Sequence, residues 1–123
     1  MTITEFMEAR IAEDEAMARA AIRHGDGAWR AGDEPDPEGD VYDERAIYGD
    51  DLHIYDEGGH DENHAAHIAR HDPARVLAEC KAKRAVLAEI KRYRWDEDPP
   101  PIITRALAAV HADHPDYRQE WAL

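Results

Sequence analysis

The dipeptide Asp72-Pro73 marks the boundary between two helices in this chain of 123 residues. Proline disfavours the α conformation in the residue before it, and it is well placed at the first position of a new helix, where Asp72 can serve as the N-cap. We therefore expect one helix to end near His71. A second helix, the longest of the chain, should begin at residue 73 and end near residue 93.

Four of the eight histidines lie in the stretch that contains this boundary, residues 58–77. On a helix that advances about 100° per residue, their side chains fall within a wedge of roughly 60° and form one stripe. Either His60 or Asp61 can be the N-cap of this helix, and His60 lies outside the helix if Asp61 is the cap. The histidines of the stripe are His60, His64, His67 and His71.

The histidine stripe has three interpretations, one of which is a pH-dependent latch formed by histidines that titrate near pH 6. Two histidines one helical turn apart can bind one metal ion, because their side chains project from the same face. Alternatively, the imidazoles cap helices, bond to backbone carbonyls and pack on aromatic rings at a helix junction. No HExxH motif, Walker loop, Gly-rich dinucleotide loop or nucleophile elbow is present, so no catalytic residue is assigned. The candidate zinc ligands are His64, His67, His71 and His114.

The chain is acidic, with 28 Asp and Glu residues against 15 Lys and Arg residues. Thirteen of the acidic residues lie between Asp33 and Glu62, where Arg45 is the single basic residue. This charge argues against direct binding to nucleic acid, which depends on neutralising phosphates with Lys and Arg. The acidic block either keeps the protein soluble or presents a negative face to a basic protein partner.

Length and composition predict a cytoplasmic α+β protein with a single domain. The single cysteine, Cys80, excludes an internal disulfide and agrees with a reducing compartment. No apolar run approaches the roughly 18 residues of a membrane span, so no membrane partner is expected. We expect a long N-terminal helix in residues 1–24, an acidic loop and β-hairpin in residues 25–57, and a three-helix part with a docked tail in residues 58–123.

Within the N-terminal helix, Arg10 and Asp14 fall inside the apolar stripe, one turn apart. They form either an edge pair whose stems reach water or a polar pair that faces a site. Residues 25–39 are rich in Gly, Pro and Asp and are expected to be a loop, with Trp29 as a lid over the core.

The hairpin is expected to pair residues 45–48 with residues 52–55, with Leu52 and Ile54 facing the core. Residues 41 and 42 form a further β-rich segment. A short helix over residues 102–111 should direct Ile103, Leu107 and Val110 inward. The last expectation is a junction, in which His67 or His71 lies near Asp113 or His114.

Two signatures resemble a known family. They are HIARHDPARVL at residues 67–77 and ADHPDY at residues 112–117, followed by Trp121. With the acidic first helix, they resemble the family of small uncharacterised actinobacterial and phage proteins called domain of unknown function 6221. The resemblance implies no activity, and His60 and His64 are particular to this sequence. The positions that match the family pattern are His67, His71, Asp72, Pro73, Arg75, Asp113, His114, Pro115 and Tyr117.

The first function hypothesis is a non-catalytic cytoplasmic protein of actinobacterial, phage or prophage origin that binds an unidentified protein partner. The second is a zinc-binding protein or metal-dependent hydrolase that uses the histidine stripe. The missing catalytic motifs favour the first, in which no cofactor is needed. The candidate interaction and junction residues are Arg10, Asp14, Trp29, Asp72, Asp113, Tyr117 and Trp121.

Overall fold

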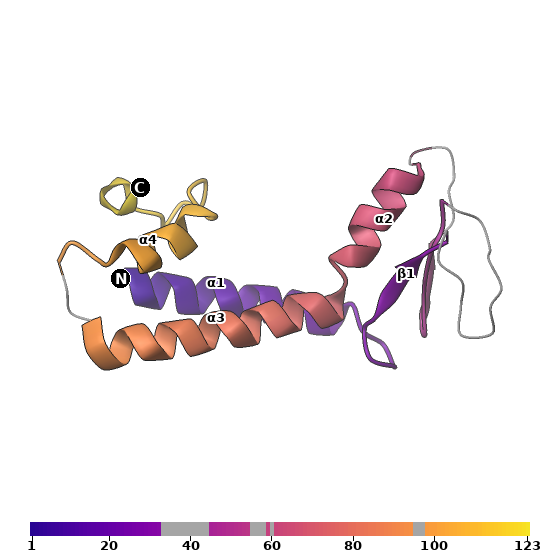
Figure 1. The fold of residues 1–123 in the computed structure, drawn as a ribbon, viewed down its shortest axis with the longest axis horizontal. Helices are drawn as coiled ribbons and strands as arrows, with labels where there is room; N and C mark the ends of the chain where they lie inside the picture. Colours follow the sequence, from indigo (N-terminus) through magenta and orange to yellow (C-terminus); the bar gives the residue numbers. More distant parts are fainter. Residues whose placement is uncertain (33–44, 55–58, 60, 95–97) are drawn as a thin grey trace. The chain divides into compact units, whose positions relative to one another are not determined.

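The computed structural model describes residues 1–32, 45–54, 59, 61–94 and 98–123 (Figure 1). These residues contain helices and a small antiparallel sheet, so the predicted α+β class with a long N-terminal helix is confirmed. In chain order the elements are α1 (Ile3–Ala20), β1 (Trp29–Ala31), β2 (Ile47–Gly49), β3 (Leu52–Ile54), α2 (Glu62–Arg70), α3 (Pro73–Arg94), α4 (Ile102–Ala109) and the 3₁₀ helix η1 (Gln119–Trp121).

The chain groups into two compact units, and α1 and α3 each contribute residues to both. Unit 1 consists of residues 1–15 and 79–123, and unit 2 consists of residues 16–78. None of the described helices is both long and apolar enough to span a membrane. Most of the acidic block, including the β-rich segment at residues 41 and 42, lies outside the described residues.

Unit 1 begins with a capping box at the start of α1. The backbone N–H of Glu5 donates to Thr2 Oγ1, and the backbone N–H of Thr2 donates to Glu5 Oε1, both at 3.1 Å. The hydrogen bonds from Thr2 lower the pKa of Glu5. Two exposed ion pairs, Glu8–Lys91 and Glu15–Arg84, join α1 to α3. These contacts hold the two helices together over a thin apolar core.

The core of unit 1 is built from α1, α3, α4 and the C-terminal tail. Phe6 lies at its centre with no exposed surface. On α3, Cys80, Leu87 and Ile90 are buried. The other buried core residues of this unit are Ile3, Met7, Ile11, Thr104, Ala108 and Trp121.

The inward face predicted for α4 is wrong. Ile103 is 49% exposed and Val110 is 76% exposed, whereas the small residues Thr104 and Ala108 are fully buried. Leu107 is half-buried. Sequence periodicity identifies an apolar stripe, but the tertiary packing decides which face is covered, and large apolar residues are often left on the surface.

Unit 2 contains a three-stranded sheet in the order β1-β2-β3, covered by α2 (Figure 1). The β2–β3 hairpin is confirmed, with Ile47 opposite Ile54 and Gly49 opposite Leu52. The core between α2 and the sheet consists of Ala31, Ile47, Ala65 and Ala69, with Trp29 and Leu52 packed against it.

One expectation for unit 2 is wrong. The loop predicted for residues 25–39 does not hold at residues 29–31, which form β1, pair with β2 and place Trp29 opposite Gly49. Because a three-residue strand is too short for an alternating pattern, its pairing comes from tertiary contacts. Ile54 lies opposite the buried Ile47 and therefore on the core-facing side of the sheet, as predicted, but it is 38% exposed because it ends the edge strand β3.

The predicted boundaries of α2 and α3 are confirmed. Asp61 is the N-cap of α2, and a capping box forms because His64 Nδ1 accepts from the backbone N–H of Asp61 at 3.0 Å. One carboxylate oxygen of Asp72 accepts from the backbone N–H of Arg75 at 2.8 Å. The other accepts from the backbone N–H of Trp29 at 2.9 Å. Asp72 therefore caps α3 and holds the start of β1 against it.

We expect Asp72→Ala to lower the free energy of unfolding by about 1–3 kcal/mol, because it removes a helix cap and leaves a second backbone donor unpaired. Asp72→Ser should lose less, since a hydroxyl can still cap α3. Urea denaturation of the three proteins measures the difference. Equal stability of the Ala variant and the native chain would show that the carboxylate is dispensable.

Candidate functional site

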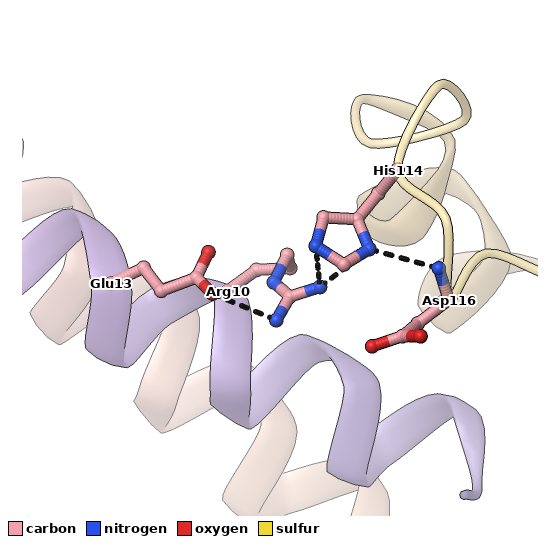
Figure 2. Close-up of polar contacts among 4 residues, drawn as sticks. All are labelled: Arg10, Glu13, His114 and Asp116. Carbon is pink, nitrogen blue, oxygen red and sulfur yellow. Dashed lines mark hydrogen bonds and ion pairs between the residues drawn. The ribbon is translucent and has the colours of Figure 1, made fainter.

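The most enclosed charged group among the described residues of unit 1 is the guanidinium of Arg10, on the buried face of α1. Arg10 is only 6% exposed. Its Nη1 lies 2.8 Å from Nδ1 and 2.5 Å from Nε2 of His114, and its Nη2 donates to Glu13 Oε1 at 2.9 Å (Figure 2). A charge of this kind is costly to bury without partners, so the tail must bring an acceptor to α1.

The tail holds His114 in place through its own backbone. The N–H of Asp116 donates to His114 Nδ1 at 3.0 Å, as Figure 2 shows. Nδ1 is therefore the acceptor of this hydrogen bond. The Arg10 guanidinium can only donate, and its Nη1 faces both nitrogens of the ring.

Aromatic side chains surround this polar contact. The Phe6 ring centroid lies 5.6 Å from that of His114 and 5.2 Å from that of Trp121, and Arg10 Cζ lies 5.0 Å from the Phe6 centroid. Tyr117 packs edge-on against both Phe6 and Trp121. Aromatic pairs and cation–π contacts of this geometry add to the apolar burial. The cluster therefore docks the tail as one layer on α1.

Two features of the cluster depend on burial. Arg10 Nε is buried and has no hydrogen-bond partner among the described residues. His111, whose ring lies 6.2 Å from that of Phe6, has a pKa lowered mainly by burial, while the negative charge of Asp14 opposes the shift. Both features indicate a water-poor environment that disfavours additional positive charge.

The structure brings together three of the predicted interaction and junction residues, Arg10, Tyr117 and Trp121, with the predicted zinc ligand His114. The expected partner of Arg10 was Asp14, but the structure pairs Arg10 with Glu13, because residues three apart also face each other on a helix. Asp14 is half-buried and Asp113 is exposed. Sequence reasoning missed Phe6, and it considered His111 only as a further metal ligand. The sequence offered one signal for Phe6, since it is the only Phe of the chain and lies one helical turn before Arg10.

The remaining predicted residues belong to unit 2. Trp29 lies on β1 and Asp72 caps α3, so both have structural contacts. The exposed rings of His67 and His71 lie 4.4 Å apart, and His71 Nδ1 is 2.8 Å from the His67 carbonyl oxygen. His64 belongs to the cap of α2.

Zinc binding and the histidine junction stay predictions. No group of three or more His, Cys, Asp or Glu side chains in the described ranges is arranged to hold a metal ion. His60 of the stripe lies outside those ranges. The predicted junction would join His67 or His71, which belong to unit 2, to Asp113 or His114, which belong to unit 1. Each unit, described by itself, contains only one of the two sides of this junction.

Comparison with known proteins identifies the family. A family model described as a family of unknown function, DUF6221, matches residues 1–123. The chain belongs to this family. Searches of curated proteins and of solved structures find no match. Family membership therefore assigns no activity, and the geometry of the chain has to support any function.

We expect His114→Phe to destabilise the protein by about 1–3 kcal/mol, because it keeps an aromatic ring beside Phe6 but removes the acceptor of a buried guanidinium. Asp113→Ala, at the exposed neighbouring position, should change stability by less than about 0.5 kcal/mol. Equilibrium denaturation of both variants measures the contrast. If the Phe variant were as stable as the Ala variant, the Arg10–His114 contact would not hold the tail.

His111 should make the protein less stable in mild acid. Its pKa is lowered in the folded state, so the unfolded chain binds the proton more tightly. The contribution of neutral His111 to the free energy of unfolding is fully present above the ordinary histidine pKa of about 6.5. It is lost as the pH falls below that value. His111→Gln should therefore weaken the fall in melting temperature between pH 7.5 and pH 5.5. An unchanged slope would show that His111 titrates normally.

Proposed function

We propose that this protein is a non-catalytic binding protein whose partner is a basic, amphipathic segment of another protein. The observation that supports the proposal most directly is the exposed apolar face of α4. Ile102 is 68% exposed, Ile103 is 49% exposed and Val110 is 76% exposed. We call this surface, defined by these three residues, the α4 face.

Helical geometry places the three residues of the α4 face on one side. At about 100° per residue, Ile102, Ile103 and Val110 fall within a sector of roughly 100° that also contains the exposed Ala106. The buried Thr104 and Ala108 lie on the opposite side. A contiguous apolar stripe on a small protein marks an interaction surface more often than an isolated exposed residue does.

The charges around the α4 face favour a basic partner. Asp98 precedes the helix and Asp113 follows it, and both are exposed. Arg105, the only charged residue of α4, donates to the backbone carbonyls of Pro100 and Ala122 at 3.1 and 2.9 Å. Its charge is therefore directed toward its own unit. Acidic residues on both sides of an apolar stripe suit a helix with an apolar face and flanking Lys or Arg.

The net charge argues against a second copy of this chain as the occupant. Each copy carries a formal charge of −13, so bringing two copies together would be opposed by electrostatic repulsion. The same charge would attract a basic partner from a distance, and the acidic block between Asp33 and Glu62 would add to this attraction. The acidic block and the α4 face thus support the same class of partner.

The chemistry of the buried groups supports a non-catalytic role. The buried guanidinium of Arg10 is engaged by both Glu13 and His114. Burial raises the pKa of the Cys80 thiol, which disfavours the nucleophilic thiolate. Cytoplasmic location and actinobacterial or phage origin belong to the same proposal and rest on the sequence composition and resemblance.

We expect Val110→Asp and Ile103→Asp to weaken binding of a fluorescent, 18-residue amphipathic helix of Leu and Lys by at least tenfold. Each Asp adds negative charge, which by itself would strengthen the attraction to Lys, so a loss would isolate the apolar contact. Fluorescence anisotropy at two salt concentrations measures the dissociation constants.

Ile68→Asp is the matched control, because Ile68 is a 39% exposed residue on α2. It should leave binding unchanged, and a peptide of Leu and Glu should bind weakly to every variant. Binding that survives both α4 substitutions would contradict the proposal. Concentration-dependent dimers of the native chain in analytical ultracentrifugation, lost in Val110→Asp, would assign the α4 face to self-association instead.

A further inference from the structure

Unit 1 contains a pocket that the proposed function does not use. It has a volume of about 590 Å³, within the range of small-molecule sites. Its walls come from the start of α1, from α3, from the proline segment before α4 and from the tail. None of the three residues of the α4 face lines it, so the pocket and the α4 face are separate surfaces.

The polar side of the pocket contains an unsatisfied hydroxyl. Thr104 lines the pocket and is 0% exposed, and its Oγ1 has no hydrogen-bond partner among the described residues. Buried hydroxyl groups are rarely left unpaired, because they lose their hydrogen bonds to water and gain none in return. Thr104 therefore marks a point where a ligand atom would be held.

Two features on the same side of the pocket attract an anion, and they act against the carboxylates of Glu5, Asp98 and Glu120, which also line the pocket. Thr104 is in the first turn of α4, an eight-residue helix whose N-cap, Pro101, provides no side-chain hydrogen bond. The first-turn amides of a helix attract negative charge. Arg118 also lines the pocket, and its exposed partner Glu120 is 3.5 Å away. A pair of this kind is weak, so a ligand can compete for Arg118.

The opposite side of the pocket is apolar. Ile3, Ile90 and the indole of Trp121 line it, and all three are at most 6% exposed. Pro99, Pro100 and Pro101 form the adjoining wall, and proline has no amide hydrogen that would need a partner. Glu5, the acidic residue of this wall, is engaged by Thr2 in the α1 capping box. An apolar body would be accommodated here.

We propose that this pocket binds a small organic anion with an aromatic or branched apolar body. The carboxylate accepts hydrogen bonds from Thr104 Oγ1 and Arg118, and the body packs on Trp121, Ile3 and Ile90. The combination of one orienting polar group with an apolar wall is typical of small-molecule sites.

Phenylacetate is a suitable probe, and phenylacetamide is its neutral counterpart of nearly the same shape. We expect the full-length protein to show saturable ¹H–¹⁵N chemical-shift changes at the Trp121 indole and the Thr104 amide with phenylacetate, and at least fivefold weaker binding of phenylacetamide. Thr104→Val should weaken phenylacetate binding about tenfold, whereas Thr104→Ser, which keeps the hydroxyl, should stay within about threefold.

Arg118→Gln, at an exposed position, provides a second variant that does not disturb the core, and it should weaken binding severalfold. Val110→Asp should leave binding unchanged, which separates this pocket from the α4 face. The proposal is overturned if phenylacetate causes no saturable change, if phenylacetamide binds equally well, or if neither Thr104→Val nor Arg118→Gln alters the dissociation constant.

Discussion

The buried guanidinium of Arg10 is the constraint on which unit 1 depends. A cation that is 6% exposed must have partners, and α1 by itself supplies only the carboxylate of Glu13. The second partner, His114, comes from a tail that has little regular structure of its own. The Asp116 amide positions His114, so the contact between Arg10 and His114 fixes the conformation of the tail. In this conformation Tyr117 and Trp121 pack on Phe6.

Asp72 has a comparable role in unit 2. Its two carboxylate oxygens accept backbone N–H groups from α3 and β1, which are more than forty residues apart in the chain. The sheet beyond it has strands of three residues each and a core made largely of alanines, so apolar burial alone offers little stability. In both units the hydrogen bonds of a single charged side chain therefore supply stability that a larger hydrophobic core would otherwise provide.

The two proposed surfaces follow from how α4 packs. Thr104 and Ala108 face the core, which leaves Ile103 and Val110 outside and places the Thr104 hydroxyl beside a pocket. An α4 packed on its larger residues would have neither an apolar outer face nor this hydroxyl in the pocket. The family assignment gives no activity with which to compare these surfaces. They involve different residues of one helix, so each can be tested without disturbing the other.

Local chemistry in the sequence determined where the helices begin. Thr2 with Glu5, Asp61, and Asp72 with Pro73 act within three or four residues, so their effects can be read without knowing the fold. The β2–β3 hairpin is equally local. Tertiary structure alone decided that residues 29–31 form a strand, that Arg10 bonds to His114, and that α4 buries its small face. These outcomes depend on contacts between distant segments, and a periodic pattern carries no information about which segment will cover which face.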